Sequence, residues 1–221
     1  MGYDLVIFDN DGVLVDSEPL ANGILAEYLT ELGHPTSYEE SLRDYMGAAV
    51  HRVHDLVMER TGGRLPDDFE EQLNARTFAA LEREARAVPG VEEVLGALTA
   101  SGVGYCLASS GSHEKIRVGH RAAGLDGWFE EEWIFSSEDV GRGKPAPDLF
   151  LHAARSMGVE PGRCVVVEDS PLGIEAAVAA GMDVFAFTAM LPADRLPGAT
   201  GHFGDMKQLT GLLGLEAGLG M

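Results

Sequence analysis

The feature of this sequence that most constrains its fold is a short apolar run, Leu5–Phe8, that ends in the polar turn Asp9-Asn10-Asp11-Gly12. A continuous apolar run bounded by a turn is typical of a strand that is buried on both faces of a parallel sheet. From Pro19 to Arg86, apolar residues recur at helical spacing and no strand-like run interrupts them. The first strand therefore has to pair with strands that follow residue 100.

After Pro89-Gly90, helical stretches alternate with short apolar runs, which are Tyr105–Ala108, Trp133–Phe135, Cys164–Val167 and Val184–Phe187. This alternation predicts an α/β fold with a Rossmann-like parallel sheet and helices on both faces. The 221 residues, 45% of them hydrophobic, suffice for one main core and a small second unit. We predict a core domain formed by residues 1–17 and 88–221, and an inserted α-helical domain at 18–87.

The charge balance limits the partners of the chain. It has 36 acidic and 16 basic residues and a formal charge of −20, which repels nucleic acids and anionic membranes. No apolar stretch approaches the roughly 20 residues that span a bilayer, and no basic leader precedes Tyr3. We expect a soluble cytoplasmic protein, and a monomer. The two cysteines, Cys106 and Cys164, lie in apolar runs and are expected to be buried thiols.

Two carboxylates follow the first strand directly. In an extended segment, side chains two residues apart share a face, so Asp9 and Asp11 can point into one pocket, one as nucleophile and one as acid/base. Gly12 suits a tight turn or a close approach of the backbone to a ligand. The Asp-x-Asp-Gly spacing also occurs in solvated turns and calcium loops. Its position at the end of a buried strand favours a functional site.

Three further polar segments lie at or near the ends of later elements. They are Ser109-Ser110-Gly111-Ser112, which offers hydroxyls and free amides before a helix, Gly143-Lys144-Pro145, and Glu168-Asp169 before Ser170-Pro171. Each alone could be a helix cap, a surface lysine or a solvated loop. Because ligands bind at the carboxyl ends of the strands in open parallel sheets, all of these segments are expected to meet in one cleft.

The order Asp9-x-Asp11-Gly12, Ser109, Lys144-Pro145, Glu168-Asp169 resembles the four motifs of the haloacid dehalogenase-like hydrolase superfamily. The most similar branch is the β-phosphoglucomutase-like one, which inserts a helical cap after the first motif. The resemblance covers nearly the whole chain, and the segments Phe8–Glu18 and Val167–Ala177 carry its most specific part. The dehalogenases that named the family lack the second aspartate of the first motif, so Asp11 favours phosphate chemistry.

The resemblance implies Mg²⁺-dependent hydrolysis of a small phosphate monoester, such as a sugar phosphate, through an aspartyl-phosphate. In this scheme Asp9 is the nucleophile, Asp11 is the general acid/base, and Ser109 and Lys144 hold phosphoryl oxygens. Gly12, Ser110 and Gly111 would contact the substrate. The metal ligands would be Asp9, the backbone carbonyl of Asp11, and Asp169, with Glu168 as a further ligand or an outer partner. Because the protein and the phosphate are both anionic, Mg²⁺ and Lys144 would have to offset the charge.

The resemblance leaves two alternatives to a phosphatase, which are a phosphomutase and a non-catalytic binding module of the same fold. In the mutases, a cap histidine couples cap closure to the acid/base aspartate, and this chain has Ala21 there. An arginine early in the cap grips a second phosphate, and Val50 falls near its place, although Arg43 or Arg52 could substitute. These departures favour hydrolysis.

The cap segment contains two further candidates. Residues Asp16 to Glu18 are expected to form the hinge between core and cap. His51 and His54 lie three residues apart on a predicted cap helix, where they could face the cleft or the solvent.

Overall fold

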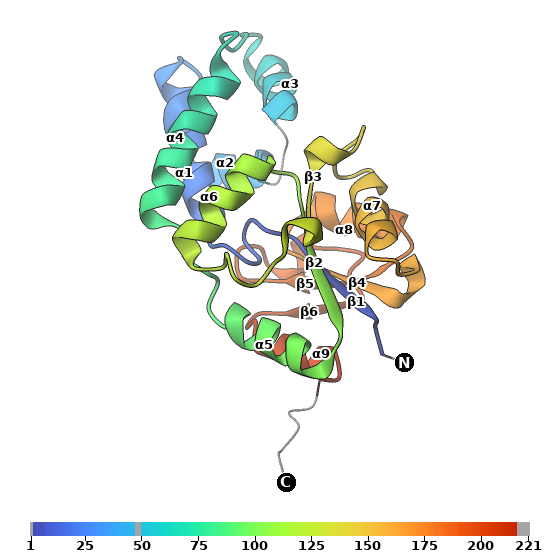
Figure 1. Ribbon diagram of the computed structural model, residues 1–221. Helices are drawn as coiled ribbons and strands as arrows, with labels where there is room; N and C mark the ends of the chain where they lie inside the picture. The colour runs from blue at the N-terminus through green and yellow to red at the C-terminus, as the bar shows by residue number, and fades with distance from the viewer. Residues whose placement is uncertain (1, 47–49, 216–221) are drawn as a thin grey trace.

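The computed structural model describes residues 2–46 and 50–215, and it has the predicted α/β architecture (Figure 1). Its strands are β1 (Leu5–Phe8), β2 (Gly104–Ser109), β3 (Ile134–Ser136), β4 (Cys164–Glu168), β5 (Asp183–Phe187) and β6 (Gly201–Phe203). Its helices are α1 (Glu18–Glu31), α2 (Tyr38–Asp44), α3 (Val50–Thr61), α4 (Phe69–Glu84), α5 (Val91–Ser101), α6 (His113–Ala123), α7 (Asp148–Ser156), α8 (Pro171–Ala179) and α9 (Gln208–Leu212).

The six strands form one parallel sheet in the order β3-β2-β1-β4-β5-β6. The first strand lies between β2 and β4, with Ile7 opposite both Cys106 and Val166, which confirms that it pairs with strands beyond residue 100. The strand β6 was not predicted, because three residues that include a glycine and a histidine form no apolar run.

Helices cover the sheet on both faces, as predicted. Val6 and Phe8 pack into an apolar cluster that contains side chains of α5, α6 and α9. Leu5 and Ile7 point the other way, into a cluster with side chains of α7 and α8. Successive residues of a strand point to opposite faces, so a strand covered on both faces needs apolar residues at every position.

The strand order also separates the two cysteines. Cys106 on β2 and Cys164 on β4 lie on opposite sides of β1, and both are buried free thiols. Two strand spacings of about 4.8 Å put their Cα atoms beyond the reach of a disulfide. The prediction that these cysteines are not bridged is confirmed.

Helices α1 to α4 lie together beside α6 and apart from the sheet (Figure 1). They have an apolar cluster of their own, formed by residues such as Leu29, Val57 and Phe69. The two connections between these helices and the sheet run side by side, because the amide of Asp16 donates to the carbonyl of Arg86 and that of Val88 to the carbonyl of Leu14, each at 2.9 Å. The domain boundaries at 17/18 and 87/88 stay a prediction.

Within the part of the chain that the structure describes, no helix combines the length and the apolar character that a membrane crossing requires.

Candidate active site

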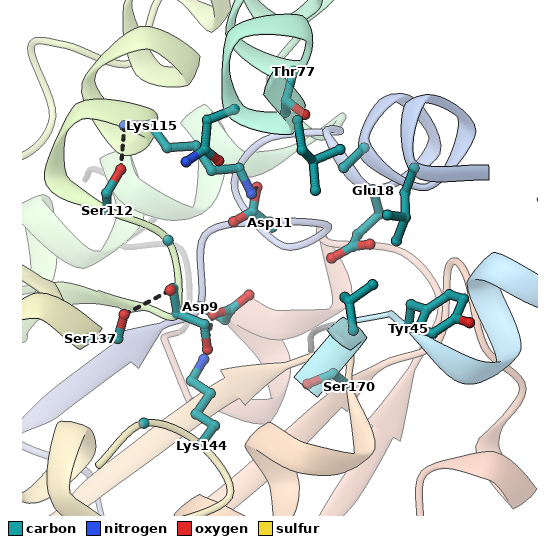
Figure 2. A pocket seen from close by; sticks show the side chains of 18 of the residues that line it. Asp9, Asp11, Glu18, Tyr45, Thr77, Ser112, Lys115, Ser137, Lys144 and Ser170 are labelled. Carbon is teal, nitrogen blue, oxygen red and sulfur yellow. Dashed lines mark hydrogen bonds and ion pairs between the residues drawn. The ribbon is translucent and has the colours of Figure 1, made fainter. Parts of the chain in front are cut away.

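A cavity of about 470 Å³ opens at the carboxyl ends of the strands, between the sheet and the helices α1, α3 and α4 (Figure 2). Such a volume is typical of small-molecule sites. Of the predicted site residues, the cavity walls contain Asp9, Asp11, Ser110, Gly111, Lys144 and Asp169. Polar segments from separate parts of the chain therefore meet in one cleft, as the parallel topology requires.

The turn after β1 is held by its own backbone. The carbonyl of Asn10 accepts hydrogen bonds from the amides of Leu14 at 2.9 Å and Val15 at 3.0 Å. Gly12 has a φ of 81°, where a side chain is strained. A Cβ atom at Gly12 would also collide with Oδ2 of Asp169. Gly12 thus lets the first and the last predicted motif approach each other.

Lys144 is the cation nearest to Asp9. Its buried Nζ donates to Oδ1 of Asp9 and, at 2.8 Å, to Oε1 of Glu168. Burial alone would lower the pKa of Lys144, but the two carboxylates outweigh burial and raise it. The lysine is therefore a fixed positive charge beside the nucleophile candidate.

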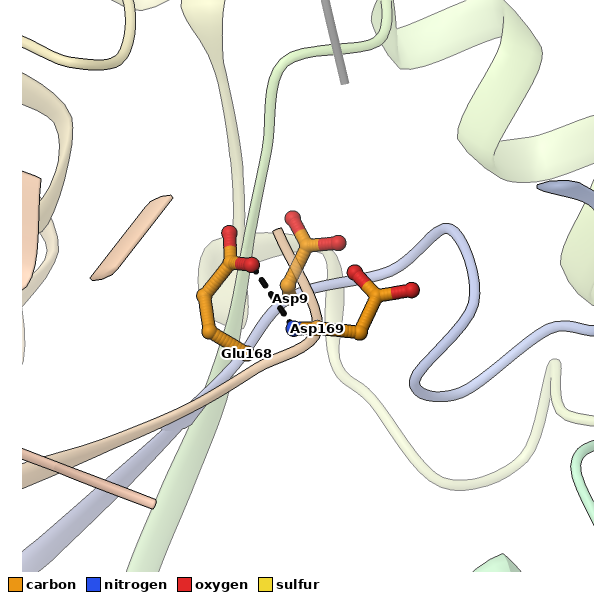
Figure 3. A group of neighbouring side chains, drawn as sticks. All are labelled: Asp9, Glu168 and Asp169. Atoms are coloured by element: carbon orange, nitrogen blue, oxygen red, sulfur yellow. Dashed lines mark hydrogen bonds between the residues drawn. The ribbon is translucent and has the colours of Figure 1, made fainter. Parts of the chain in front are cut away.

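Asp9, Glu168 and Asp169 form a buried cluster, each offering a carboxylate oxygen within 4.8 Å of the others (Figure 3). Burial, together with the neighbouring carboxylates, raises the pKa of Asp9 to about 8 and that of Asp169 well above its usual value. Oδ2 of Asp169 is buried and accepts no hydrogen bond from the described residues. A hard divalent cation with oxygen ligands fits this donor set, since it would engage the orphaned oxygen and offset the crowded charge.

Glu168 is more constrained than its two neighbours in the cluster. Its Oε2 accepts the amides of Asp169 and Ser170, at 2.8 and 2.7 Å, and the hydroxyl of Ser170 at 2.9 Å. Its other oxygen faces Lys144. A Cβ at Gly173 would collide with this carboxylate. Glu168 therefore has less freedom to bind a metal than Asp9 or Asp169.

The carboxylate of Asp11 lies apart from that cluster. It accepts hydrogen bonds from Oγ of Ser17 at 2.6 Å and pairs with Nζ of Lys115 at 3.0 Å. Burial would raise its pKa, but the Lys115 ammonium and these hydrogen bonds outweigh burial and lower it. Lys115 was not among the residues predicted from the sequence. A lysine in the first turn of a helix is unfavourable beside the helix dipole, and that placement was a usable signal.

Glu18 was assigned only to a hinge, yet it lines the cavity. Its side chain is buried and accepts a hydrogen bond from Nδ2 of Asn22 at 2.6 Å. Burial and the charge of Asp11 raise the pKa of Glu18 to about 7. A buried glutamate beside a second carboxylate is thus part of the site, although its segment predicted only a hinge.

Ser109 is placed differently from its neighbours. It is fully buried, its hydroxyl accepts the amide of Gly111 at 3.0 Å, and it is not among the residues of the cavity wall. Ser110, Gly111 and Ser112 do line the cavity, and the hydroxyl of Ser137 donates to the carbonyl of Ser110 at 2.8 Å. In this arrangement Ser109 supports the loop, and a direct contact of its hydroxyl with phosphate stays a prediction.

The helical segment holds the remaining candidates. Ala21 lines the cavity, whereas His54 packs edge-on against Phe69 and is not part of the cavity wall. Arg43 pairs with Asp44 on the surface, and Arg52 is exposed. The side chains of Val50 and His51 lie outside what the structure describes.

Comparisons with known proteins agree with this geometry. Residues 3–181 match the sequence profile of a family described as haloacid dehalogenase-like hydrolase. The 6-phosphogluconate phosphatase of Escherichia coli is 32% identical over 84% of this chain and 83% of its own length. Hexitol phosphatase A of the same organism is 34% identical over 85% and 83%. The crystal structure of a haloacid dehalogenase-like protein of unknown function from Agrobacterium tumefaciens is 36% identical, with a TM-score of 0.83 over 96% of this chain and 98% of that one.

Proposed function

The chain belongs to the haloacid dehalogenase-like hydrolases and is a phosphatase, and we propose that it hydrolyses a small phosphate monoester, a sugar phosphate or a related metabolite, through an aspartyl-phosphate on Asp9. The observation that carries this proposal is the surroundings of Asp9. Asp9 is a carboxylate at a strand end that contacts a buried lysine and belongs, with Glu168 and Asp169, to a cluster that could hold a metal ion, so it is placed to attack an anionic phosphorus centre.

The reaction would proceed in two displacements. An oxygen of Asp9 attacks phosphorus, the bond to the alcohol oxygen breaks, and Asp11 donates a proton to that oxygen. Water then attacks the phosphorus of the aspartyl-phosphate while Asp11 takes up its proton, which releases inorganic phosphate and restores both carboxyl groups. Ser17 and Lys115 would position Asp11 during these transfers. Because both lower the pKa of Asp11 in the free protein, its carboxylate would have to take up a proton in the complex with the anionic substrate before the first displacement.

The phosphoryl oxygens would be held by Lys144 and by the loop that follows β2. Ser110 and Gly111 line the cavity there and present backbone close to the carboxylates. The Oγ atom of Ser109 supports this loop through the Gly111 amide. Gly12 would let the substrate approach the backbone of the first turn.

We propose Mg²⁺ as the cofactor, held by Asp9, Asp169 and the backbone carbonyl of Asp11. Bound there, the ion would neutralise the crowded carboxylates and the phosphate. The unpartnered oxygen of Asp169 supports its direct role. The hydrogen bonds that already engage both oxygens of Glu168 support an outer role for that residue.

A phosphomutase would use the same chemistry and return the phosphoryl group to the sugar. Ala21 in the cavity wall favours hydrolysis, because an alanine has no group that could engage Asp11. One experiment distinguishes the two activities. The protein is incubated with β-glucose 1-phosphate, Mg²⁺ and a trace of β-glucose 1,6-bisphosphate, and the formation of glucose 6-phosphate and of free phosphate is measured in the same sample. Rapid isomerisation with little phosphate release would show that the protein is a phosphomutase rather than a hydrolase.

The proposed function is tested by phosphate release from a panel of phosphorylated metabolites, with Mg²⁺ and with EDTA. We expect turnover of at least one small monoester that EDTA abolishes and Mg²⁺ restores. No release from any member, p-nitrophenyl phosphate included, would indicate a non-catalytic binding module.

A further inference from the structure

We propose that one face of α4 selects the alcohol part of the substrate, and that it accepts an uncharged, hydroxyl-rich alcohol while it rejects one that carries a second anionic group. The inference rests on the proposed function and names the substrate class of that site. The face consists of Glu70, Asn74 and Thr77, which all line the cavity. Their spacing of four and three residues puts them on one side of the helix.

The polar groups of this face are free to bind a ligand. Thr77 is only 6% exposed, yet its hydroxyl makes no hydrogen bond to any residue that the structure describes, and it points into the cavity (Figure 2). The side chains of Asn74 and Glu70 likewise have no hydrogen-bonding partner among the described residues. The hydroxyl of Thr77 is accessible from the cavity, since Oδ2 of Asp169 is the one buried side-chain oxygen without a partner among the described residues. It is therefore available to a water molecule or to a hydroxyl of the substrate.

The positive charges of the cavity are already paired with carboxylates. Among the described residues of its wall, Lys115 and Lys144 are the cationic ones, and they contact Asp11, and Asp9 with Glu168, respectively. The wall also contains the carboxylates of Glu70 and Glu138. A phosphate beside Asp9 meets Lys144, whereas a group beside this face of α4 meets a carboxylate, an amide and a hydroxyl.

This distribution discriminates between substrates by charge. A substrate hydroxyl can donate to the carboxylate of Glu70 and exchange hydrogen bonds with Asn74 and Thr77. A carboxylate or a second phosphate at the same place would face like charge and lose part of its hydration without gaining a cation. The cavity therefore favours sugar or polyol monophosphates over phosphorylated sugar acids and bisphosphates.

The test uses two substrates that differ at one carbon. D-glucitol 6-phosphate and 6-phosphogluconate share their carbon chain and configuration, but carbon 1 is a hydroxymethyl group in the first and a carboxylate in the second. Both compete with p-nitrophenyl phosphate in the presence of Mg²⁺, so their relative affinities are measured even where their turnover is slow. We expect glucitol 6-phosphate to compete about tenfold better or more, the effect of an unpaired charged group. Equal or stronger competition by 6-phosphogluconate, or competition by neither compound, overturns the inference.

Two variants tie the preference to α4. Thr77→Val keeps the shape of the side chain and removes the hydroxyl, and it should raise the KM for glucitol 6-phosphate about two- to tenfold with a smaller change in kcat. Glu70→Gln should improve competition by 6-phosphogluconate about two- to fivefold, the range of exposed charge pairs. The matched control is Glu82→Gln, the same change at an exposed position of α4 outside the cavity wall.

The control separates a local contact from the general charge of the protein. If Glu70→Gln and Glu82→Gln change the competition ratio equally, α4 does not select the substrate by charge. Hydrolysis of p-nitrophenyl phosphate without a preference between the two sugar derivatives would support the proposed function and contradict the selection by α4. The absence of hydrolysis of any phosphate monoester would contradict both.

Discussion

His120 on α6 and Asn10 in the turn after β1 are joined by a buried hydrogen bond, with Nε2 of the histidine 2.9 Å from Oδ1 of the asparagine. Asn10 separates the two aspartates of the first motif, so this bond ties the loop that presents both carboxylates to a helix that covers the sheet. The asparagine oxygen can only accept a hydrogen bond, which requires the proton on Nε2. The ring is held neutral, because burial lowers the pKa of His120 to about 4.

The pKa of His120 makes folding depend on pH. Between the usual pKa of a histidine, 6.5, and about 4, the unfolded chain binds a proton at His120 and the folded chain does not. The free energy of unfolding should therefore fall as the pH is lowered through this window, by at most roughly 3.4 kcal/mol from this residue, and above pH 6.5 nothing is lost. Urea unfolding of wild type and His120→Gln, at neutral pH and at about pH 5, isolates the effect. An identical loss of stability in both proteins would contradict it.

Asp9→Asn should abolish turnover and keep the fold. An amide cannot attack phosphorus, and the change is nearly isosteric beside Lys144, which keeps Glu168 as its partner. Phosphate release and thermal unfolding are measured on the same preparation. A folded variant that retains about one tenth of the wild-type rate or more would show that Asp9 is not the nucleophile.

Asp11→Asn should lower turnover by roughly 10²–10⁴-fold, the usual range for general acid–base catalysis. Metal binding should persist, because the carboxylate of Asp11 lies with Ser17 and Lys115 rather than in the acidic cluster. A p-nitrophenolate leaving group needs little protonation, so formation of the phospho-enzyme from an aryl phosphate should suffer less. Equal losses of rate with alkyl and aryl phosphates would contradict a role of Asp11 as the general acid.

Gly12→Ala should disable the site, and Gly33→Ala should not. Both glycines have positive φ angles, 81° and 86°, so alanine strains the backbone at each by about 1–2 kcal/mol. A Cβ at residue 12 also collides with the Asp169 carboxylate, whereas a Cβ at residue 33 meets no atom within 4 Å. We expect Gly12→Ala to lose more stability than Gly33→Ala, because the collision adds to the backbone strain, and only Gly12→Ala to lose Mg²⁺-dependent turnover. Comparable activity in the two variants would contradict the close approach of the two motifs.

Mg²⁺ should raise the melting temperature of the wild-type protein in a concentration-dependent way, because a ligand that binds only the folded state stabilises it. The stabilisation is about 2.7 kcal/mol at a concentration 100 times the dissociation constant. Asp169→Asn should lose this response, while Asp67→Asn, the same change at an exposed aspartate, should keep it. A response that Asp169→Asn retains in full would place the ion elsewhere.

The parts of the fold and site that the sequence predicted share one physical origin. Apolar runs such as Leu5–Phe8 mark buried strands, and the chemistry-bearing residues follow those strands directly, so the parallel topology alone brings Asp9 and Asp169 together. The spacing of apolar residues, together with the rule that ligands bind at the carboxyl ends of parallel strands, was sufficient to predict this part of the site. The strand β6 escaped prediction, because its three residues show no such run.

The rest of the site depends on how helices pack, and local patterns encode little of this beyond the unfavourable position of Lys115 in the first turn of α6. Lys115 reaches Asp11 only because α6 is oriented with its first turn over the cavity. Thr77 lies more than sixty residues from both aspartates in the chain, and nothing in its neighbourhood distinguishes it from an ordinary helix residue. The hydroxyl of Ser109 accepts a hydrogen bond from the backbone amide of Gly111, and a sequence motif does not specify this partner.

The paired connections at Val15 and Ala87 have a consequence for how this chain can diverge. The segment between them leaves and re-enters the sheet domain at neighbouring points, so its two ends are already closed by backbone hydrogen bonds. The entropic cost of closing such a loop rises only slowly with the number of residues in it. Insertions, deletions or a different set of helices after Glu18 would leave the strand order unchanged, and Asp9, Lys144 and Asp169 would stay in place. The residues of the proposed phosphate chemistry lie on the sheet domain, whereas the residues proposed to select the substrate lie on the inserted helices. Substrate specificity can therefore change while the reaction stays the same.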